Sequence, residues 1–228
     1  MHRSDDRGFT LIELVIVLMI IGVMAALAYS YSRAQARNVY LHQATGELQQ
    51  RAIGLRSTAL SDGKPYLLVV QDAPNNDASQ CGWWSSAACT RYFVLSAPDS
   101  TWTLGAFDPS SPGAHLDPTL GSVETGYLPR GARFYKASSY NAPPIPFDKV
   151  KVFDSSFYGT CANGASCFAV RFLTNGNVRA ELPGGGAQPT GLAFVLASDA
   201  ELEGAGGDHR GVVIGFPSGI VKTWSYAP

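Results

Sequence analysis

A single carboxylate, Glu13, lies within the most apolar stretch of this 228-residue chain. The stretch is the 20 residues from Phe9 to Ala28, and its only polar side chains are Thr10 and Glu13. A run of about 20 apolar residues can cross a bilayer as a helix. Because an acidic group at the centre of a bilayer costs about 3 kcal/mol or more, an intramembrane glutamate usually has a function. We therefore expect a cation to pair with Glu13.

The same stretch has a simpler interpretation as a secretory signal peptide. Basic residues precede it, and Ala26-Leu27-Ala28 at its end resembles a signal-peptidase site. Two features argue against cleavage there, because Glu13 interrupts the apolar core and a helical pattern continues past Ala28. The positive-inside rule sets no orientation, since the two arginines before the stretch are matched by two shortly after it.

The four cysteines form two pairs that are close in sequence, Cys81 with Cys89 and Cys161 with Cys167. In an exported domain, oxidising conditions favour disulfides. Four cysteines allow three connectivities, and we expect the local one because each pair flanks a turn-rich segment. Each short loop would then stabilise the fold by about 2–3 kcal/mol. The spacing within the pairs is not that of a zinc site, and no histidine is near, so no metal is expected there.

The segment before and inside the first cysteine loop offers two weaker candidates. Trp83 and Trp84 are either exposed aromatics for a partner or the cover of a small satellite core. Four side chains could offer oxygen ligands to calcium, although their spacing fits no EF-hand: Asp72, Asn75, Asn76 and Asp77.

The sequence contains no arrangement of nucleophile and base that is typical of an enzyme. The serine of Gly215-Phe216-Pro217-Ser218-Gly219 is wrongly placed for a nucleophile elbow and falls at a predicted turn. Asp208, His209 and Arg210 could contribute to a dyad, but a solvated loop explains them more simply. The net charge of −1 excludes general recruitment of nucleic acid or a membrane surface by charge. We predict a protein without catalytic activity, metal or cofactor.

A second helical pattern follows the apolar stretch and is expected to position it. Apolar residues recur there at spacings of three and four, and no proline occurs before Pro65. One continuous helix from Phe9 to Leu60 would be roughly 78 Å long at 1.5 Å per residue. The helix is expected to end at Ser61-Asp62-Gly63-Lys64-Pro65, where a glycine is followed by a proline that cannot continue a helix. The predicted apolar stripe consists of Leu41, Ala44, Leu48, Ala52, Leu55 and Ala59.

From Tyr66 onward, short apolar runs alternate with turn residues, and the chain has 24 glycines and 14 prolines. This pattern predicts a β-rich domain, so the expected fold class is α+β, a long amino-terminal helix packed on a β-rich head. Asn175-Gly176 predicts a hairpin with a type I′ turn, and Pro217-Ser218-Gly219 predicts another hairpin. The predicted strands are Tyr66–Gln71, Arg91–Ser96, Thr101–Phe107, Ala132–Ala137, Lys149–Phe153, Cys167–Leu173, Asn177–Leu182, Leu192–Ala197, Gly211–Phe216 and Ile220–Tyr226.

The residues that lead into the apolar stretch, Arg7-Gly8-Phe9-Thr10-Leu11-Ile12-Glu13, closely resemble the class III leader of type IV pilins and pseudopilins. In that family a prepilin peptidase cuts after the glycine, here Gly8, on the cytoplasmic side. The new terminal residue, here Phe9, is N-methylated, and the apolar segment stays on the protein. The resemblance implies that Glu13 meets the amino terminus of a neighbouring subunit during assembly. An amine and a carboxylate buried as a pair offset each other's desolvation, so Glu13 would select the register between subunits.

Three later segments look like the H-type pseudopilin or FimT-like minor pilin family: GLRSTALSDGKPYLLVV, FAVRFLTNGNVRAEL and GVVIGFPSGIVKTW. Insertions at Asp72–Cys89 and Asp108–Pro129, and the lack of paired cysteines near the carboxyl terminus, argue against an ordinary major subunit. The resemblance implies a minor pilin or pseudopilin in the tip or initiation complex of a type IV pilus or type II secretion filament. Its expected partners are other pilins or pseudopilins, the prepilin peptidase, the inner-membrane assembly platform and, before assembly, membrane lipid.

These interpretations divide the chain into a leader (1–8), a transmembrane half-helix (9–28), an amphipathic half-helix (29–62) and a β-rich head (63–228). A single pass through the bacterial inner membrane would leave the head in the periplasm until the protein enters the pilus or pseudopilus. Four arginines against one glutamate give residues 29–60 a net charge of +3, whereas eleven basic against fourteen acidic residues give 61–228 a net charge of −3.

Two other functions remain open from the sequence. One is DNA binding during natural transformation, as in some FimT-like pilins, through a face shared by four cations: Arg171, Arg179, Arg210 and Lys222. The negative charge of the head argues against it, because affinity for DNA comes largely from phosphate neutralisation. The other is an anchored β-domain unrelated to filaments.

Overall fold

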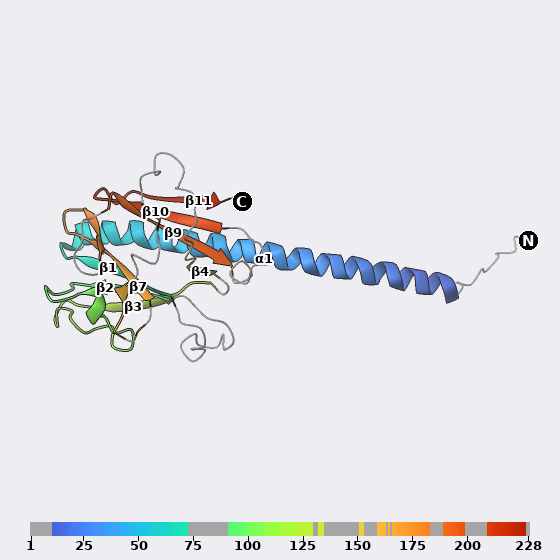
Figure 1. The fold of residues 1–228 in the computed structure, drawn as a ribbon, viewed down its shortest axis with the longest axis horizontal. Coiled ribbons are helices and arrows are strands. Elements are labelled where there is room, and N and C mark those ends of the chain that lie inside the picture. Colours follow the sequence, from blue (N-terminus) through green and yellow to red (C-terminus); the bar gives the residue numbers. More distant parts are fainter. Residues whose placement is uncertain are drawn as a thin grey trace, which may run out of the picture. The chain divides into compact units, whose positions relative to one another are not determined.

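The computed structural model describes residues 11–72, 91–129, 132–134, 151–152, 159–162, 164, 166–182, 189–198 and 209–226. The chain divides into two compact units, Met1–Val39 and Tyr40–Pro228. The helix α1 (Leu11–Asp62) contributes residues to both units, and all the strands belong to the second (Figure 1).

The helix α1 is 52 residues long and ends where the sequence predicts. Gly63 follows it with a φ of +63°, the left-handed conformation that commonly terminates helices and that glycine adopts without strain. Pro65 cannot continue the helix. The hydroxyl of Tyr66 donates a hydrogen bond to the Asp62 carboxylate at 2.7 Å, which ties the last helical residue to the first strand.

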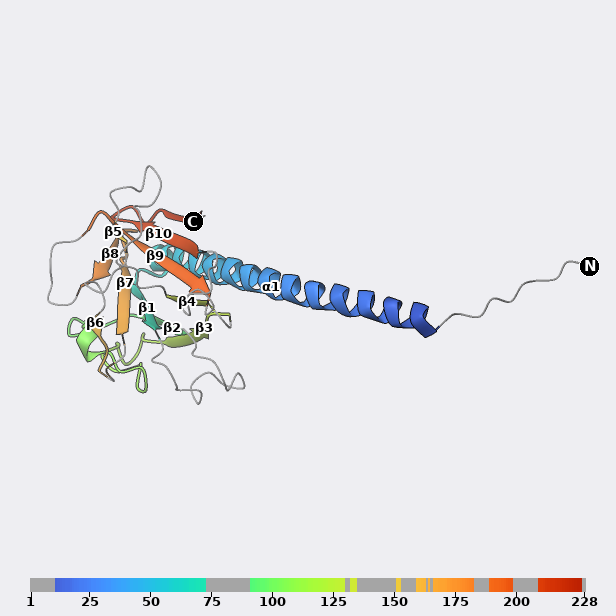
Figure 2. The same ribbon diagram turned by 45° about the vertical axis from the view of Figure 1, so that its right-hand side comes forward.

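The first sheet has the strand order β3-β2-β1-β7-β6, and β8 also pairs with β7 (Figure 2). All of these pairings are antiparallel. The strands are β1 (Tyr66–Asp72), β2 (Arg91–Ser96), β3 (Val123–Tyr127), β6 (Gly159–Thr160), β7 (Ser166–Phe172) and β8 (Val178–Glu181).

The second sheet has the order β11-β10-β9-β4, and β5 pairs with β9 in parallel. Its strands are β4 (Ala132–Phe134), β5 (Lys151–Val152), β9 (Gly191–Ser198), β10 (His209–Gly215) and β11 (Val221–Tyr226). The predicted α+β class is confirmed, and the predicted hairpin at Pro217 joins β10 to β11.

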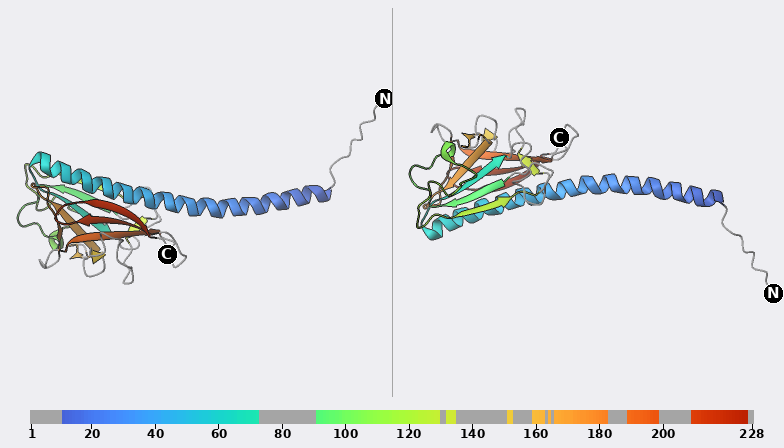
Figure 3. Two further views of the ribbon diagram at one scale, coloured as in Figure 1. Left: turned by 90° about the horizontal axis from the view of Figure 1, so that it is seen from above. Right: turned by 90° about the horizontal axis from the view of Figure 1, so that it is seen from below.

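The apolar stripe predicted on α1 is buried along its whole length. Its six residues, from Leu41 to Ala59, are between 0% and 8% exposed. They share one core with residues of both sheets, in which Phe168 of β7 stacks on Phe194 of β9 with ring centroids 4.5 Å apart. Figure 3 shows the carboxyl-terminal half of α1 alongside the strands. Burial of this stripe positions the helix on the head.

A second core lies on the other face of the first sheet. It contains Leu67 and Val69 of β1 and Phe93 and Leu95 of β2, together with apolar residues of the following loop. Because β1 and β2 are buried on both faces, their sequences are almost continuous apolar runs rather than alternating ones.

The prediction of a strand directly after β2 is wrong. The predicted strand Thr101–Phe107 contains the short 3-10 helix η2 (Leu104–Ala106), which turns Leu104 and Phe107 into the second core. The sequence pattern also does not indicate the short strand β6 or the edge strand β3, which falls within the segment Asp108–Pro129 interpreted as an insertion. Four of the five residues of β3 are exposed, so β3 lacks the apolar alternation that reveals a half-buried strand.

The hairpin predicted at Asn175-Gly176 joins β7 to β8, but its turn is not type I′. That turn needs a positive φ at both central residues, and here only Gly176 has one, at +78°. The Gly176 N–H donates to the Leu173 carbonyl at 2.9 Å, and the Leu173 N–H donates to Asn177 at 2.8 Å. The loop is therefore the three-residue type with glycine in the left-handed position.

Tyr92 of β2 forms a hydrogen bond that connects α1 to the first sheet near its edge. Its hydroxyl donates to the Glu47 carboxylate at 2.5 Å, and burial together with this hydrogen bond raises the pKa of Tyr92 to about 12. The ring crosses the neighbouring strand at Gly126, where the Cβ of any other residue would overlap it. Gly126 thus allows the contact between β2 and α1.

We predict that Gly126→Ala lowers the free energy of unfolding by about 1–3 kcal/mol, because the added methyl group displaces the Tyr92 ring. The matched control is Gly46→Ala, since a Cβ at Gly46 meets no atom within 4 Å. Replacing a helical glycine in open space should raise stability by about 0.5–1 kcal/mol. Urea unfolding of the full-length protein in detergent, followed by tryptophan fluorescence, measures both. Equal stabilities of the two variants would contradict the role of Gly126.

Three aspartates order the exposed loop between β2 and β3 in the same way. Asp99, Asp108 and Asp117 each accept hydrogen bonds from the hydroxyl and backbone N–H of the Ser or Thr two residues later, at 2.6–2.9 Å. These hydrogen bonds, the side-chain ones first, lower the pKa of each aspartate. A carboxyl group with a lowered folded pKa stabilises the fold above its unfolded pKa of about 4, and this contribution is lost as the pH falls through the folded value.

Asp117→Asn tests this linkage, because the amide keeps an oxygen acceptor but carries no charge. At pH 6 the variant should be less stable than the wild type. The difference should shrink as the pH falls below about 4, where the wild-type carboxyl group becomes protonated as well. Urea titrations between pH 6 and pH 2.5 follow the difference. A difference that stays constant over this range would contradict the linkage.

Candidate functional site

The first part of α1, from Leu11 to Ser32, is apolar around nearly its whole circumference. Among the described residues, Leu11–Ser32 forms one helical segment of 22 residues that is long and apolar enough to cross a membrane, judged by length and composition. Its large apolar side chains, from Leu11 to Tyr31, are between 42% and 81% exposed. A helix that exposes this much apolar surface requires lipid or protein around it.

Two neutral polar side chains in and just past this segment form hydrogen bonds within the helix itself. The Ser30 hydroxyl donates to the Leu27 carbonyl oxygen at 2.9 Å, one turn earlier. The Gln35 amide, just past the segment, donates to the Tyr31 hydroxyl at 2.9 Å. A carboxylate differs from these groups because a formal charge in lipid or in a protein interior requires a cation.

Glu13 lies in the first turn of α1 and is exposed. The amino-terminal end of a helix favours a carboxylate through the partial positive charge of its free N–H groups. Gly8 and Phe9, the expected cleavage site and mature terminus, lie outside the described residues. Cleavage after Gly8 would place a cationic amine four residues before Glu13, close to one helical turn away.

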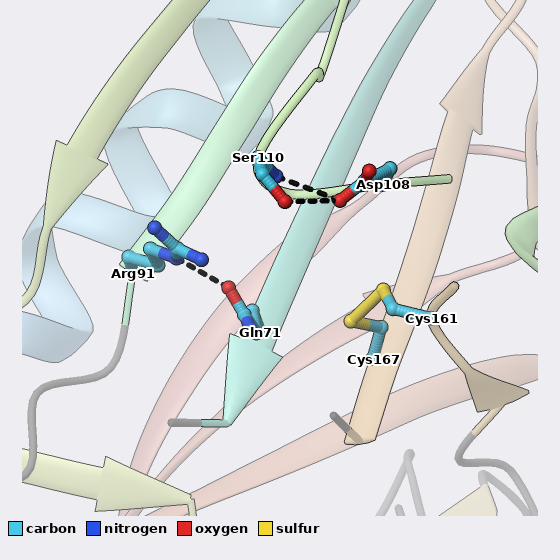
Figure 4. Close-up of a disulfide and its surroundings, with 6 residues drawn as sticks. All are labelled: Gln71, Arg91, Asp108, Ser110, Cys161 and Cys167. Carbon is cyan, nitrogen blue, oxygen red and sulfur yellow. Dashed lines mark hydrogen bonds between the residues drawn. A yellow bond between two sulfur atoms is a disulfide. The ribbon is translucent and has the colours of Figure 1, made fainter. Parts of the chain in front are cut away.

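The structure joins Cys161 and Cys167 in a disulfide with Cα atoms 5.7 Å apart, which is the local pair expected from the sequence (Figure 4). Both cysteines are buried, at 1% and 0% exposure, in the second core. Near them, Arg91 donates to the buried side chain of Gln71 (Figure 4). The other candidates in and before the first cysteine loop lie outside the described residues: Cys81, Cys89, Trp83, Trp84 and the possible calcium ligands Asn75, Asn76 and Asp77.

The four cations of the candidate DNA-binding face do not belong to one sheet. They lie on two sheets: Arg171 on β7 and Arg179 on β8, Arg210 on β10 and Lys222 on β11. Arg171 and Arg179 both contact Glu181, at 2.5 Å and 3.3 Å, and Arg171 is only 9% exposed. Glu181 offsets one of the two guanidinium charges and Arg171 is buried, so these three side chains offer phosphate at most the single charge of Arg179.

The expectation that His209 belongs to a solvated loop is wrong. His209 is the first residue of β10 and is 7% exposed, while its neighbour Asp208 lies outside the described residues. In the part of the chain that the structure describes, no three His, Cys, Asp or Glu side chains are grouped so that they could hold a metal ion.

Sequence reasoning missed the polar contacts that fix α1 to the head. Besides the bond between Tyr92 and Glu47, Arg51 forms an ion pair with Glu124 of β3 at 2.6 Å. The signal that could have revealed one of them is Gly126, since a glycine within a strand often marks the close approach of another group. Nothing in the sequence indicated which carboxylate each cation would meet.

Residues 3–29 match the family described as the prokaryotic N-terminal methylation motif. The match covers the leader and the apolar stretch, including Gly8, Phe9 and Glu13, and leaves the head unmatched. It supports a type IV pilin-like protein that a prepilin peptidase processes, with a structural rather than an enzymatic role. No curated protein and no solved structure matches this chain.

We predict that Glu13→Leu is inserted and processed normally but is not incorporated into filaments. In an assembled core the substitution leaves the amine of a neighbouring terminus without its carboxylate, a loss of about 3–5 kcal/mol by comparison with other broken buried pairs. Incorporation should fall by about two orders of magnitude or more. The measurement is recovery of the processed variant with sheared filaments, at equal abundance in the membrane.

The matched control is Ser30→Leu, which also replaces a polar residue of the apolar segment by leucine. Because the Ser30 hydroxyl is satisfied within its own helix, this variant should be recovered at the wild-type level. Wild-type recovery of Glu13→Leu would contradict the pairing.

Proposed function

We propose that this chain is a minor pilin or pseudopilin. A prepilin peptidase cuts it after Gly8, Phe9 becomes the N-methylated terminus, and the apolar part of α1 anchors the protein in the inner membrane with its head in the periplasm. The protein then joins the tip or initiation complex of a type IV pilus or type II secretion filament. The main support for this proposal is that the face of α1 opposite the buried stripe is uncharged and partly apolar.

This outer face consists of residues spaced alternately by three and four positions, on the side of the helix opposite the buried stripe. Five of the six residues are exposed and Gly46 is half-buried; Ile53 and Leu60 are each 50% exposed. The outer face comprises Gln43, Gly46, Gln50, Ile53, Ser57 and Leu60. Leu60 lies at its border, because one side of its side chain is next to the turn at Gly176.

The outer face carries no formal charge because the charged residues of this part of α1 all contact the head. Glu47 accepts the hydrogen bond from Tyr92, and Arg51 pairs with Glu124. The Nε of Arg56 donates to the Gly176 carbonyl oxygen at 3.0 Å. From Tyr40 to Ser61, no other Asp, Glu, Lys or Arg occurs.

A helix face in permanent contact with water normally carries charged side chains. The outer face instead combines two large apolar side chains, a glycine, a serine and two glutamines, a composition suited to packing against another helix. The apolar segment of the first unit has the same requirement for a lipid or protein neighbour. Both features of α1 support assembly with other pilins or pseudopilins. In this proposal the inner-membrane assembly platform moves the chain from the lipid into the filament.

We predict that Ile53→Lys lowers incorporation into filaments by at least tenfold, since assembly would bury an unpaired ammonium group. The stability of the head should change little, because the side chain is exposed in the single subunit. The control is Thr103→Lys, which adds the same charge to an exposed loop of the head. Recovery with sheared filaments and urea unfolding are measured for both variants.

Equal incorporation of Ile53→Lys and Thr103→Lys would show that the outer face is not an assembly surface. If Ile53→Lys also unfolds the head, a weaker change, Ile53→Gln, keeps the comparison with Thr103→Lys informative. It should then lower incorporation without lowering stability.

A further inference from the structure

Among the described strands, β3 ends the first sheet and leaves one row of its backbone groups unpaired. The Ser96 N–H donates to the Ser122 carbonyl at 3.0 Å, so the residue just before β3 turns its backbone towards β2. Because successive residues of an antiparallel strand face alternate neighbours, Glu124 and Gly126 do the same. The N–H and C=O groups of Val123, Thr125 and Tyr127 therefore point away from the sheet.

This outward edge is accessible. Within the described ranges β3 pairs with β2 and with no other strand. Val123 and Tyr127 are 38% and 48% exposed, and Thr125 is exposed as well. An open edge strand is a template for pairing with another chain, and proteins usually protect such edges with lysine, proline or a covering segment. None of these protective residues occurs in the sequence of β3.

A groove of about 560 Å³ runs between β3 and α1. The helix contributes Gln50, Gly54 and Thr58 to its walls, and the sheet contributes Val94, Ser122 and Glu124. The ion pair between Arg51 and Glu124 crosses the groove, and its two side chains are 40% and 52% exposed. Gln50 belongs both to this groove and to the outer face of α1, so the two surfaces are continuous.

The two faces of β3 differ in chemistry. On the face away from α1, Val123 and Tyr127 present apolar and aromatic surface beside Thr125. On the groove face, the carboxylates of Glu47 and Glu124 outnumber the single guanidinium of Arg51. A strand added to this edge would place its alternate side chains on these two faces. The best complement is a strand that alternates apolar residues with polar or basic ones.

We propose that β3 accepts an extended strand of this alternating kind from a neighbouring filament subunit. The proposal rests on the proposed function and adds to it a specific site of contact. A subunit docked on the outer face of α1 lies beside the groove, because the two surfaces share Gln50. Backbone hydrogen bonds to Val123, Thr125 and Tyr127 would join the two heads, and the groove would select the side chains of the incoming strand.

The test uses the full-length protein in cells that assemble it into filaments. A photo-crosslinking amino acid replaces Tyr127, and the crosslinked peptides are identified by mass spectrometry. We expect crosslinks to an extended segment of a filament subunit in which apolar and basic or polar residues alternate. The matched reference position is Thr103, which is exposed on a loop away from β3 and should give at least tenfold less of this product.

A second variant tests the backbone contact directly. Thr125→Pro removes an outward N–H while leaving the bonds between β2 and β3 in place, and it should lower the Tyr127 crosslink at least tenfold. Thr125→Ala keeps the N–H and should leave the yield unchanged. If the proline variant fails to fold, Val123→Lys protects the edge by charge and should lower the yield by a similar factor.

Two results would overturn the proposal. One is crosslinking from Tyr127 only to proteins that are not filament subunits, or to none, while the chain is incorporated normally. The other is an undiminished crosslink in both Thr125→Pro and Val123→Lys. Either result leaves the pilin assignment intact, because incorporation is measured separately. If the chain without any β3 substitution is not incorporated into filaments, and its Tyr127 crosslink is absent as well, the proposed function itself would be contradicted.

Discussion

Burial of one stripe of α1 is the constraint on which the rest of the structure depends. Three alanines of that stripe, Ala44, Ala52 and Ala59, are 0% exposed, so the backbone of the helix comes close to the sheets. Both sheets contribute to the core that covers the stripe. Polar contacts then fix the rotation of the helix, with Glu47 bound to Tyr92, Arg51 to Glu124 and Arg56 to the turn at Gly176.

This arrangement determines which surface remains for a partner. Because the charged side chains between Tyr40 and Ser61 all contact the head, the opposite face of the helix is uncharged, and it leaves Ile53 and Leu60 each half exposed. The same helix is apolar around nearly its whole circumference from Leu11 to Tyr31, with Glu13 as its carboxylate. One helix therefore combines a surface that stabilises its own head with surfaces that a single subunit leaves uncovered.

The sequence predicted the elements that depend on local patterns. The period of the stripe from Leu41 to Ala59, the stop at Gly63 and most strands follow from spacing and turn residues, and the leader follows from a short, specific motif. It could not predict β3, because a strand exposed on both faces has no apolar alternation. Nor could it pair Arg171 with Glu181 or Tyr92 with Glu47, since these contacts depend on how the sheets are arranged in three dimensions.

If α1 is the element through which subunits assemble, the apolar segment must stay on the mature protein. The most direct test is the intact mass and terminal sequence of the protein recovered from membranes. We expect a chain that begins at N-methylated Phe9 and retains residues 9–28. A mature chain that begins near Tyr29 would contradict it, since that result would mean removal of the segment as a secretory signal.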